Sequence, residues 1–197
     1  MAFLTACVTR AGRRTALFRC IPFLLLASLV PATRSSAQPS ADEYQVKAAY
    51  ILNFARFVEW PSKVLAPSAP IFIAVVGDDP FPGGLDSLLK GKVANGHPIR
   101  LRHQHWDEAL NQNDIVFISA SEEPHLPQIL RFLATQSVLT ISDIDRFSLR
   151  GGIIELVMVG NRVRFDIDRR PAEAARLQIS SRLLNVARAV HENGVSR

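Results

Sequence analysis

Apolar residues between positions 41 and 60 recur at intervals of three and four, which is the spacing of one face of an α-helix. Asp42 and Glu43 suit the positive amino-terminal end of a helix, and Pro61 cannot extend one. We therefore expect a helix over residues 41–60, with an apolar stripe made of Val46, Ala49, Tyr50, Asn53, Phe54, Phe57 and Val58.

The middle of the chain alternates between strand and helix patterns. Continuous β-branched and aromatic runs at 71–76 and 115–118 are typical of strands buried on both faces. Two more strands and two short helices are expected at 98–103, 138–141, 84–89 and 126–134. This order of strand, helix and strand favours a largely parallel sheet with helices on both faces.

The pattern changes after residue 150. Residues 153–159 and 162–167 read as two strands joined at Gly160 and Asn161, a pair that tolerates the positive φ angles of a two-residue hairpin turn. A closing helix is expected at 171–190. The predicted fold class is a single α/β domain over residues 38–197, a three-layer sandwich with a mostly parallel central sheet and an antiparallel C-terminal hairpin.

The first 37 residues have the composition of a cleaved signal peptide. Basic residues precede an apolar run at 21–30, and Ser35, Ser36 and Ala37 place small residues at the cleavage positions. The apolar run has about ten residues, whereas a membrane-spanning helix needs ~20. We therefore expect export to the periplasm with cleavage after Ala37. An uncleaved N-terminal anchor is the alternative.

Removing this segment changes the charge of the chain. The sequence has 23 Lys and Arg against 18 Asp and Glu, and five of the basic residues but no acid precede residue 38. The mature chain would therefore carry 18 of each sign, which gives no basic face for a nucleic-acid partner. Both cysteines, Cys7 and Cys20, also lie in this segment, so no disulfide is expected.

Several short segments, in order along the mature chain, carry a resemblance to a known family. They are N-F-A-R-F-V-E-W-P at 53–61, V-G-D-D-P-F at 76–81, D-I-V-F-I-S at 114–119, L-T-I-S-D at 139–143, G-G-I-I at 151–154, N-R-V-R-F-D-I at 161–167 and the stretch 177–188. Together they resemble the YfiR family of small periplasmic proteins. The resemblance implies an inhibitor of an inner-membrane diguanylate cyclase, released when an outer-membrane lipoprotein with a peptidoglycan-binding domain sequesters the inhibitor.

Two groups of side chains are candidates for contact with a partner. Phe54, Phe57 and Trp60 recur every third residue and are either core residues or an exposed aromatic anchor, since Trp and Arg dominate protein interfaces. Arg162 and Arg164 lie on the polar face of the predicted hairpin, as a solvated face or as the rim of a binding surface.

Asp78 and Asp79 follow a buried strand, at the position where α/β folds place ligand-binding loops. They are candidate ligand-loop residues. The alternative, which we favour, is that they are turn and helix-start residues.

The segment His103-Gln104-His105-Trp106-Asp107 resembles the first ligand cluster of metallo-hydrolases. Glu108 stands where that pattern continues with histidine, and no nucleophile elbow of the G-x-S-x-G type occurs in the sequence. We therefore predict no metal, no cofactor and no catalytic residue.

The sequence favours a regulatory binding protein, not an enzyme, whose partner is a diguanylate cyclase or another sensor of the inner membrane. The first alternative is a periplasmic small-ligand sensor that uses the cleft at the strand ends. The second is a metallo-hydrolase built on His103, His105 and Asp107. A homodimer is compatible with each of these functions.

Overall fold

The structure is a computed structural model that describes residues 41–62, 64–81, 83–192 and 195–196. Residues 38–197 form one compact unit. The predicted signal peptide and its cleavage site lie outside the described residues. Of the helices that are described, none is both long and apolar enough to cross a membrane.

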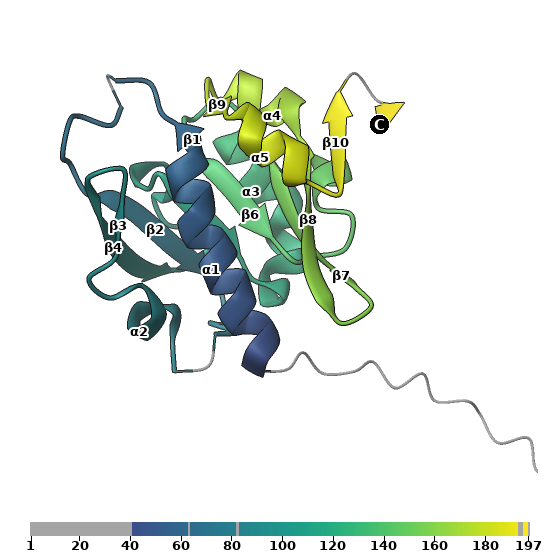
Figure 1. The fold of residues 1–197 in the computed structure, drawn as a ribbon, viewed down its shortest axis with the longest axis horizontal. Coiled ribbons are helices and arrows are strands. Elements are labelled where there is room, and N and C mark those ends of the chain that lie inside the picture. The colour runs from purple at the N-terminus through teal and green to yellow at the C-terminus, as the bar shows by residue number, and fades with distance from the viewer. Residues whose placement is uncertain (1–40, 63, 82, 193–194, 197) are drawn as a thin grey trace, which may run out of the picture. The chain divides into compact units, whose positions relative to one another are not determined.

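A mixed sheet forms the centre of the fold (Figure 1). Its strands are β2 (Ile71–Val76), β3 (Val93–Ala94), β4 (His97–Gln104), β5 (Ile115–Ile118), β6 (Leu139–Ser142), β7 (Ile154–Val159), β8 (Arg162–Asp168), β10 (Ala189–Glu192) and β11 (Val195–Ser196). Across the sheet they follow the order β11-β10-β8-β7-β6-β5-β2-β4-β3. The run from β4 to β7 is parallel, and β7 and β8 form the predicted antiparallel hairpin.

Helices cover both faces of this sheet, because alternate side chains of the central strands point in opposite directions. Ile73 and Val75 of β2 pack beneath α1 (Ala41–Phe57), while Ala74 and Val76 pack against α3 (Leu126–Leu133). Figure 1 shows α1 crossing one face of the sheet with α3 behind it. The two apolar layers confirm the predicted three-layer α/β class.

The remaining helices are short. They are α2 (Leu85–Leu89), α4 (Arg169–Ala174) and α5 (Ser181–Val186), together with 3-10 turns at Leu110–Gln112, Ala120–His125 and Ser148–Arg150. Asp168 accepts a hydrogen bond from the Arg170 N–H at the start of α4, and Ser180 accepts one from the Leu183 N–H at the start of α5. Side-chain caps thus define where both C-terminal helices begin.

Two predicted helices were wrong in extent. The first ends at Phe57, not at residue 60, because β1 (Val58–Glu59) pairs with β9 (Gln178–Ile179) in a small separate sheet. The helix expected at 171–190 is broken into α4, β9, α5 and β10, since Arg176 adopts a left-handed conformation with φ of 59°. The pairing with β1 and the return of the chain to the main sheet outweigh the helical spacing of its apolar residues.

Candidate functional site

Phe54 is a core residue and not an exposed aromatic anchor. Its side chain is 0% exposed, and its ring lies 5.1 Å from that of Phe165 on β8 and 5.8 Å from that of Tyr50. The expectation that Phe54 contacts a partner is therefore corrected. The helix face that carries it packs on the sheet, which is where the apolar stripe directs it.

Phe57 and Trp60 are partly buried at the end of α1. The Trp60 indole N–H donates to the Asp114 carbonyl oxygen at 3.2 Å, and the Ser180 N–H donates to the Phe57 carbonyl oxygen at 3.0 Å. Both residues therefore join α1 to neighbouring segments while keeping part of their surface accessible. The structure separates them from the arginine pair, which lies on the hairpin.

The tip of the β7–β8 hairpin is the exposed part of the predicted partner surface. Arg162 and Arg164 are exposed, and each pairs across the hairpin with a valine of β7. Met158 and Val159 are 44% and 46% exposed at the same tip. Because β6 ends while β7 continues, these apolar and cationic side chains lie on a hairpin that extends past its neighbour in the sheet.

Asp78 and Asp79 differ in role. Both carboxylate oxygens of Asp79 accept backbone N–H groups, from Phe81 at 2.8 Å and from Leu85 at 3.3 Å, so this side chain stabilises the turn and the start of α2. The Asp78 backbone N–H donates to the Ser121 hydroxyl at 2.9 Å, and its side chain is exposed. These contacts agree with the turn interpretation of Asp79.

The histidines of the H-x-H-x-D segment have different partners. The His103 ring nitrogen Nε2 lies 3.1 Å from an Asp86 carboxylate oxygen. For His105, it is the backbone N–H that donates to the Glu108 carboxylate. Asp107 is exposed. Over the described residues, no group of three or more His, Cys, Asp or Glu side chains is placed to hold a metal ion.

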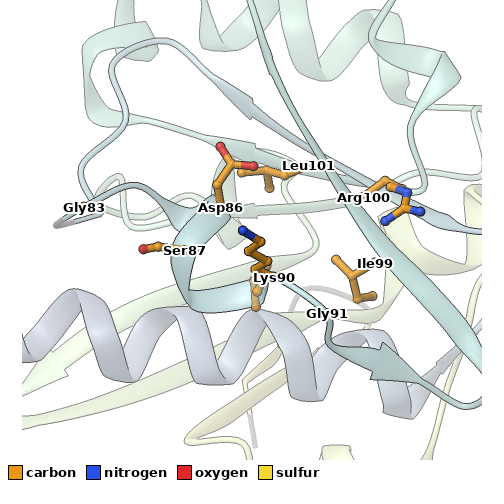
Figure 2. Close-up of a pocket in the computed structure, with 9 residues that line it drawn as sticks. Gly83, Asp86, Ser87, Lys90, Gly91, Ile99, Arg100 and Leu101 are labelled. Carbon is orange, nitrogen blue, oxygen red and sulfur yellow. The ribbon is translucent and has the colours of Figure 1, made fainter.

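A pocket of about 540 Å³ lies between α2 and β4, next to His103 (Figure 2). Figure 2 shows Lys90 extending toward Asp86, while Ser87 and Arg100 point to opposite sides. The charged residues of this pocket are exposed, so water screens them strongly. We regard it as a surface hollow of mixed charge.

A second pocket, of about 700 Å³, lies where β6 ends and β7 continues. We call it the carboxyl-edge pocket. It extends from the first turns of α1 to the start of β10, and it is lined by five acids and three cations: Glu43, Asp143, Asp145, Glu155, Asp166, Lys47, Arg146 and Arg188. Ligand sites of α/β folds lie at this edge of the sheet, at the carboxyl ends of parallel strands.

A buried ion cluster forms one wall of the carboxyl-edge pocket. The Lys47 ammonium lies 2.6 Å from Glu43 and 2.6 Å from the Oδ2 atom of Asp143, and the Lys47 side chain is 3% exposed. The Tyr44 hydroxyl also donates to Asp143 Oδ2, at 3.0 Å. Burial and the Asp143 charge raise the pKa of Tyr44 well above its usual range, so this phenol stays a neutral donor.

The opposite wall holds two further buried carboxylates. Glu155 accepts hydrogen bonds from the N–H groups of Arg146 and Ser148 and from the Ser148 hydroxyl. Asp166 pairs with Arg188 through both carboxylate oxygens. Both carboxylate oxygens of each of these acids accept hydrogen bonds, in contrast to Asp143, whose Oδ1 atom is buried with no hydrogen-bond partner among the described residues.

The sequence was compared with known families and structures. A family model described as YfiR/HmsC-like matches residues 44–188, which is most of the chain. The chain is a member of the YfiR/HmsC-like family. The match begins at Tyr44 and ends at Arg188, so it includes most residues that line the carboxyl-edge pocket, and Glu43, Ala189 and His191 lie just outside it.

The comparison with solved structures shows a similarity of fold alone. No curated protein matches the sequence. A crystal structure of a conserved domain protein from Vibrio cholerae O1 biovar El Tor is similar, with a TM-score of 0.50 and 12% identity over 75% of this chain. The match covers 60% of that chain, so this YfiR/HmsC-like protein spans less than two thirds of the length of the solved structure.

Members of this family share a known type of role. YfiR/HmsC-like proteins are known as periplasmic regulators of diguanylate cyclases, so the family to which this chain belongs is a regulatory one.

The patterns used above do not predict the buried ion cluster of this YfiR/HmsC-like protein. Lys47 lies within the predicted helix but outside its apolar stripe, and Asp143 is the last residue of the L-T-I-S-D segment. Glu155 carried a usable signal, because an acid between Ile154 and Leu156 interrupts an otherwise apolar strand. A buried acid of that kind needs donors close by.

Proposed function

We propose that this protein is exported, loses residues 1–37, and restrains an inner-membrane signalling protein such as a diguanylate cyclase by binding it. Membership of the YfiR/HmsC-like family over residues 44–188 is the observation that carries the proposal. The hairpin tip adds a structural reason, because it combines two exposed apolar side chains, Met158 and Val159, with the exposed arginines of the same hairpin.

The hairpin tip is the proposed contact surface. Met158 and Val159 supply apolar area, and Arg162 and Arg164 supply cations around it. This combination is typical of an interface with an apolar centre and a polar rim. Phe57 and Trp60 form a second, smaller candidate surface at the end of α1.

Restraint by binding requires a difference in affinity between two states of the partner. A protein that binds the inactive state about 100-fold more tightly than the active state shifts that equilibrium by ~2.7 kcal/mol. A few well-packed side chains at the centre of an interface can supply a difference of this size.

The test compares cells with and without the gene. Deletion should raise cyclic-di-GMP and surface attachment, and this effect should require one membrane cyclase. The double variant Arg162→Glu, Arg164→Glu should reproduce the deletion while keeping wild-type thermal stability, because both side chains are exposed. An unchanged nucleotide level after deletion contradicts the proposal.

A matched control separates the hairpin from general charge effects. Lys92→Glu with Arg131→Glu makes the same change in net charge at two exposed positions away from the hairpin. This control should leave cyclic-di-GMP at the wild-type level. If a Trp60 variant that folds reproduces the deletion and the arginine pair does not, the contact surface lies at the end of α1.

A further inference from the structure

Asp143 lines the carboxyl-edge pocket in a negatively charged setting, and its enclosed Oδ1 atom has no hydrogen-bond partner among the described residues. We propose that the pocket binds a small organic cation, a protonated amine on an apolar body, whose N–H groups donate to the Asp143 carboxylate. This inference goes beyond the proposed restraint of a membrane partner, because it concerns a ligand site on the protein itself.

Asp143 is the residue that points to a ligand. Its side chain is 9% exposed, and its Oδ2 atom accepts from both Lys47 and Tyr44. Its Oδ1 atom is buried and has no hydrogen-bond partner among the described residues. A buried carboxylate oxygen without a donor is costly, so a ligand that supplies an N–H group gains binding energy there.

The charge of the pocket selects a cation. Five carboxylates and three cations line it, which gives a formal charge of −2 with His191 neutral. Two of its three cations already form ion pairs, since Lys47 contacts two carboxylates and Arg188 pairs with Asp166. A negatively charged ligand would face this excess of acids, whereas an ammonium group would reduce it.

A metal ion fits the same wall poorly. The Lys47 ammonium lies 2.6 Å from Asp143 and repels any further cation at this carboxylate, a divalent ion twice as strongly as a singly charged ammonium group at the same distance. Calcium takes six to eight oxygen ligands, and no suitable group of three or more acids exists within the described part of the chain. An amine needs fewer acceptors and carries a single charge.

The pocket has the space and the apolar surface that an amine with an organic body needs. Its volume of about 700 Å³ lies within the usual range for small-molecule sites. Leu149, Val157 and Met158 contribute apolar side chains to its lining. The Asp143 Oδ1 atom is enclosed in the structure, so an incoming N–H group reaches it only after a rotation about the Cβ–Cγ bond, a torsion with a broad energy well.

Methionine supplies a built-in reporter for this site. The sequence has two methionines, Met1 and Met158, and Met158 lines the pocket. In protein labelled at the methionine methyl groups, phenethylammonium should shift the Met158 signal in a saturable manner. Phenethyl alcohol and 3-phenylpropionate, which keep the apolar body without the positive charge, should bind at least tenfold more weakly.

Asp143→Asn tests the acceptor itself, because an amide that keeps its oxygen toward Lys47 turns an N–H donor toward the ligand. This variant should weaken phenethylammonium binding at least tenfold, in line with a charge-assisted hydrogen bond. Glu123→Gln removes one negative charge outside the pocket and should change the affinity less than twofold.

Three results would overturn the inference. They are equal binding of the alcohol and the amine, displacement of the amine by calcium chloride, and a Met158 signal that does not respond to the amine. If Asp143→Asn does not fold, the comparison of the three probes on the wild-type protein decides alone. Binding is measured on purified protein, so its outcome is independent of any effect on cyclic-di-GMP.

Discussion

The Lys47 ammonium lies 2.6 Å from the Asp143 carboxylate, although the two residues are 96 positions apart in the chain. This buried pair joins the first helix to the loop that follows β6. Tyr44 and Glu43 complete the cluster from the same helix. The amino-terminal turns of α1 are therefore attached to the carboxyl edge of the sheet by charge as well as by apolar packing.

Replacing Lys47 with methionine should destabilise the protein by about 3–5 kcal/mol, because it leaves buried carboxylates without their cation. Urea unfolding followed by circular dichroism measures the change. Lys90→Met, at an exposed lysine, serves as the control and should change the free energy of unfolding by less than about 0.5 kcal/mol. A loss below ~1 kcal/mol for Lys47→Met would show that the buried pair contributes little.

Asp114 should make the stability of the protein fall as pH rises. Burial raises the pKa of this carboxyl group, although the Phe72 N–H that it accepts acts in the opposite direction. The folded state therefore binds more protons than the unfolded state between the ordinary aspartate pKa, about 4, and the raised value. This contribution to stability is present below that window and is lost as pH rises through it.

Asp114→Asn isolates this effect, since the amide oxygen can still accept from Phe72. The free energy of unfolding of the variant, relative to wild type, should increase between about pH 4 and pH 7. Urea titrations at several pH values give the difference directly. A difference that stays flat or decreases over this range is incompatible with a raised pKa at Asp114.

Gly152 should not tolerate a side chain. A Cβ atom at this position would overlap the ring of Phe147, which is fully buried. Gly152→Ala should therefore cost about 1–3 kcal/mol or more through overpacking. Gly151→Ala is the matched control, because no described atom lies within 4 Å of its added Cβ. Its φ of 101° is unfavourable for alanine, so this variant should lose about 1 kcal/mol of stability. Equal melting temperatures for the two variants would contradict this prediction.

Export with removal of a signal peptide predicts a mature chain with a defined first residue. The basic start, the short apolar run and the small residues before position 38 favour cleavage after Ala37. Intact mass of the protein from a periplasmic extract should correspond to a chain that begins at Gln38. Full-length protein recovered from the membrane fraction would support the uncleaved anchor instead.

Local signals predicted six strands of the central sheet, including the hairpin, but not the short strands β1, β3, β9, β10 and β11. Gly160 and Asn161 determine a turn through their own backbone preferences, and the runs at 71–76 and 115–118 can be buried only between two layers. The C-terminal segment was mispredicted as one helix because its apolar residues form strand pairs with residues that are distant in the sequence. Ile179 pairs with Val58, and Ala189 joins β8 beside Asp166.

The candidate site was harder to predict than the fold. The pairing of Lys47 with Asp143 depends on how the helix crosses the sheet, which no short motif encodes. The helical spacing of Phe54 was enough to predict it as a core residue. It could contact a partner only if the apolar face of the helix were exposed to solvent. Exposure of the hairpin tip follows from unequal strand lengths, which sequence patterns locate only approximately.

The pairing of β1 with β9 bears on when the chain can fold. Phe54 of the first helix packs on Phe165, and β1 pairs with β9, so both elements find some of their partners only in the last part of the polypeptide. During synthesis at about 5–20 residues per second, the emerging chain lacks these partners until it is nearly complete. Non-local pairing of this kind is slow to form. The native packing of the end of the first helix is therefore completed only after nearly all of the chain has been made.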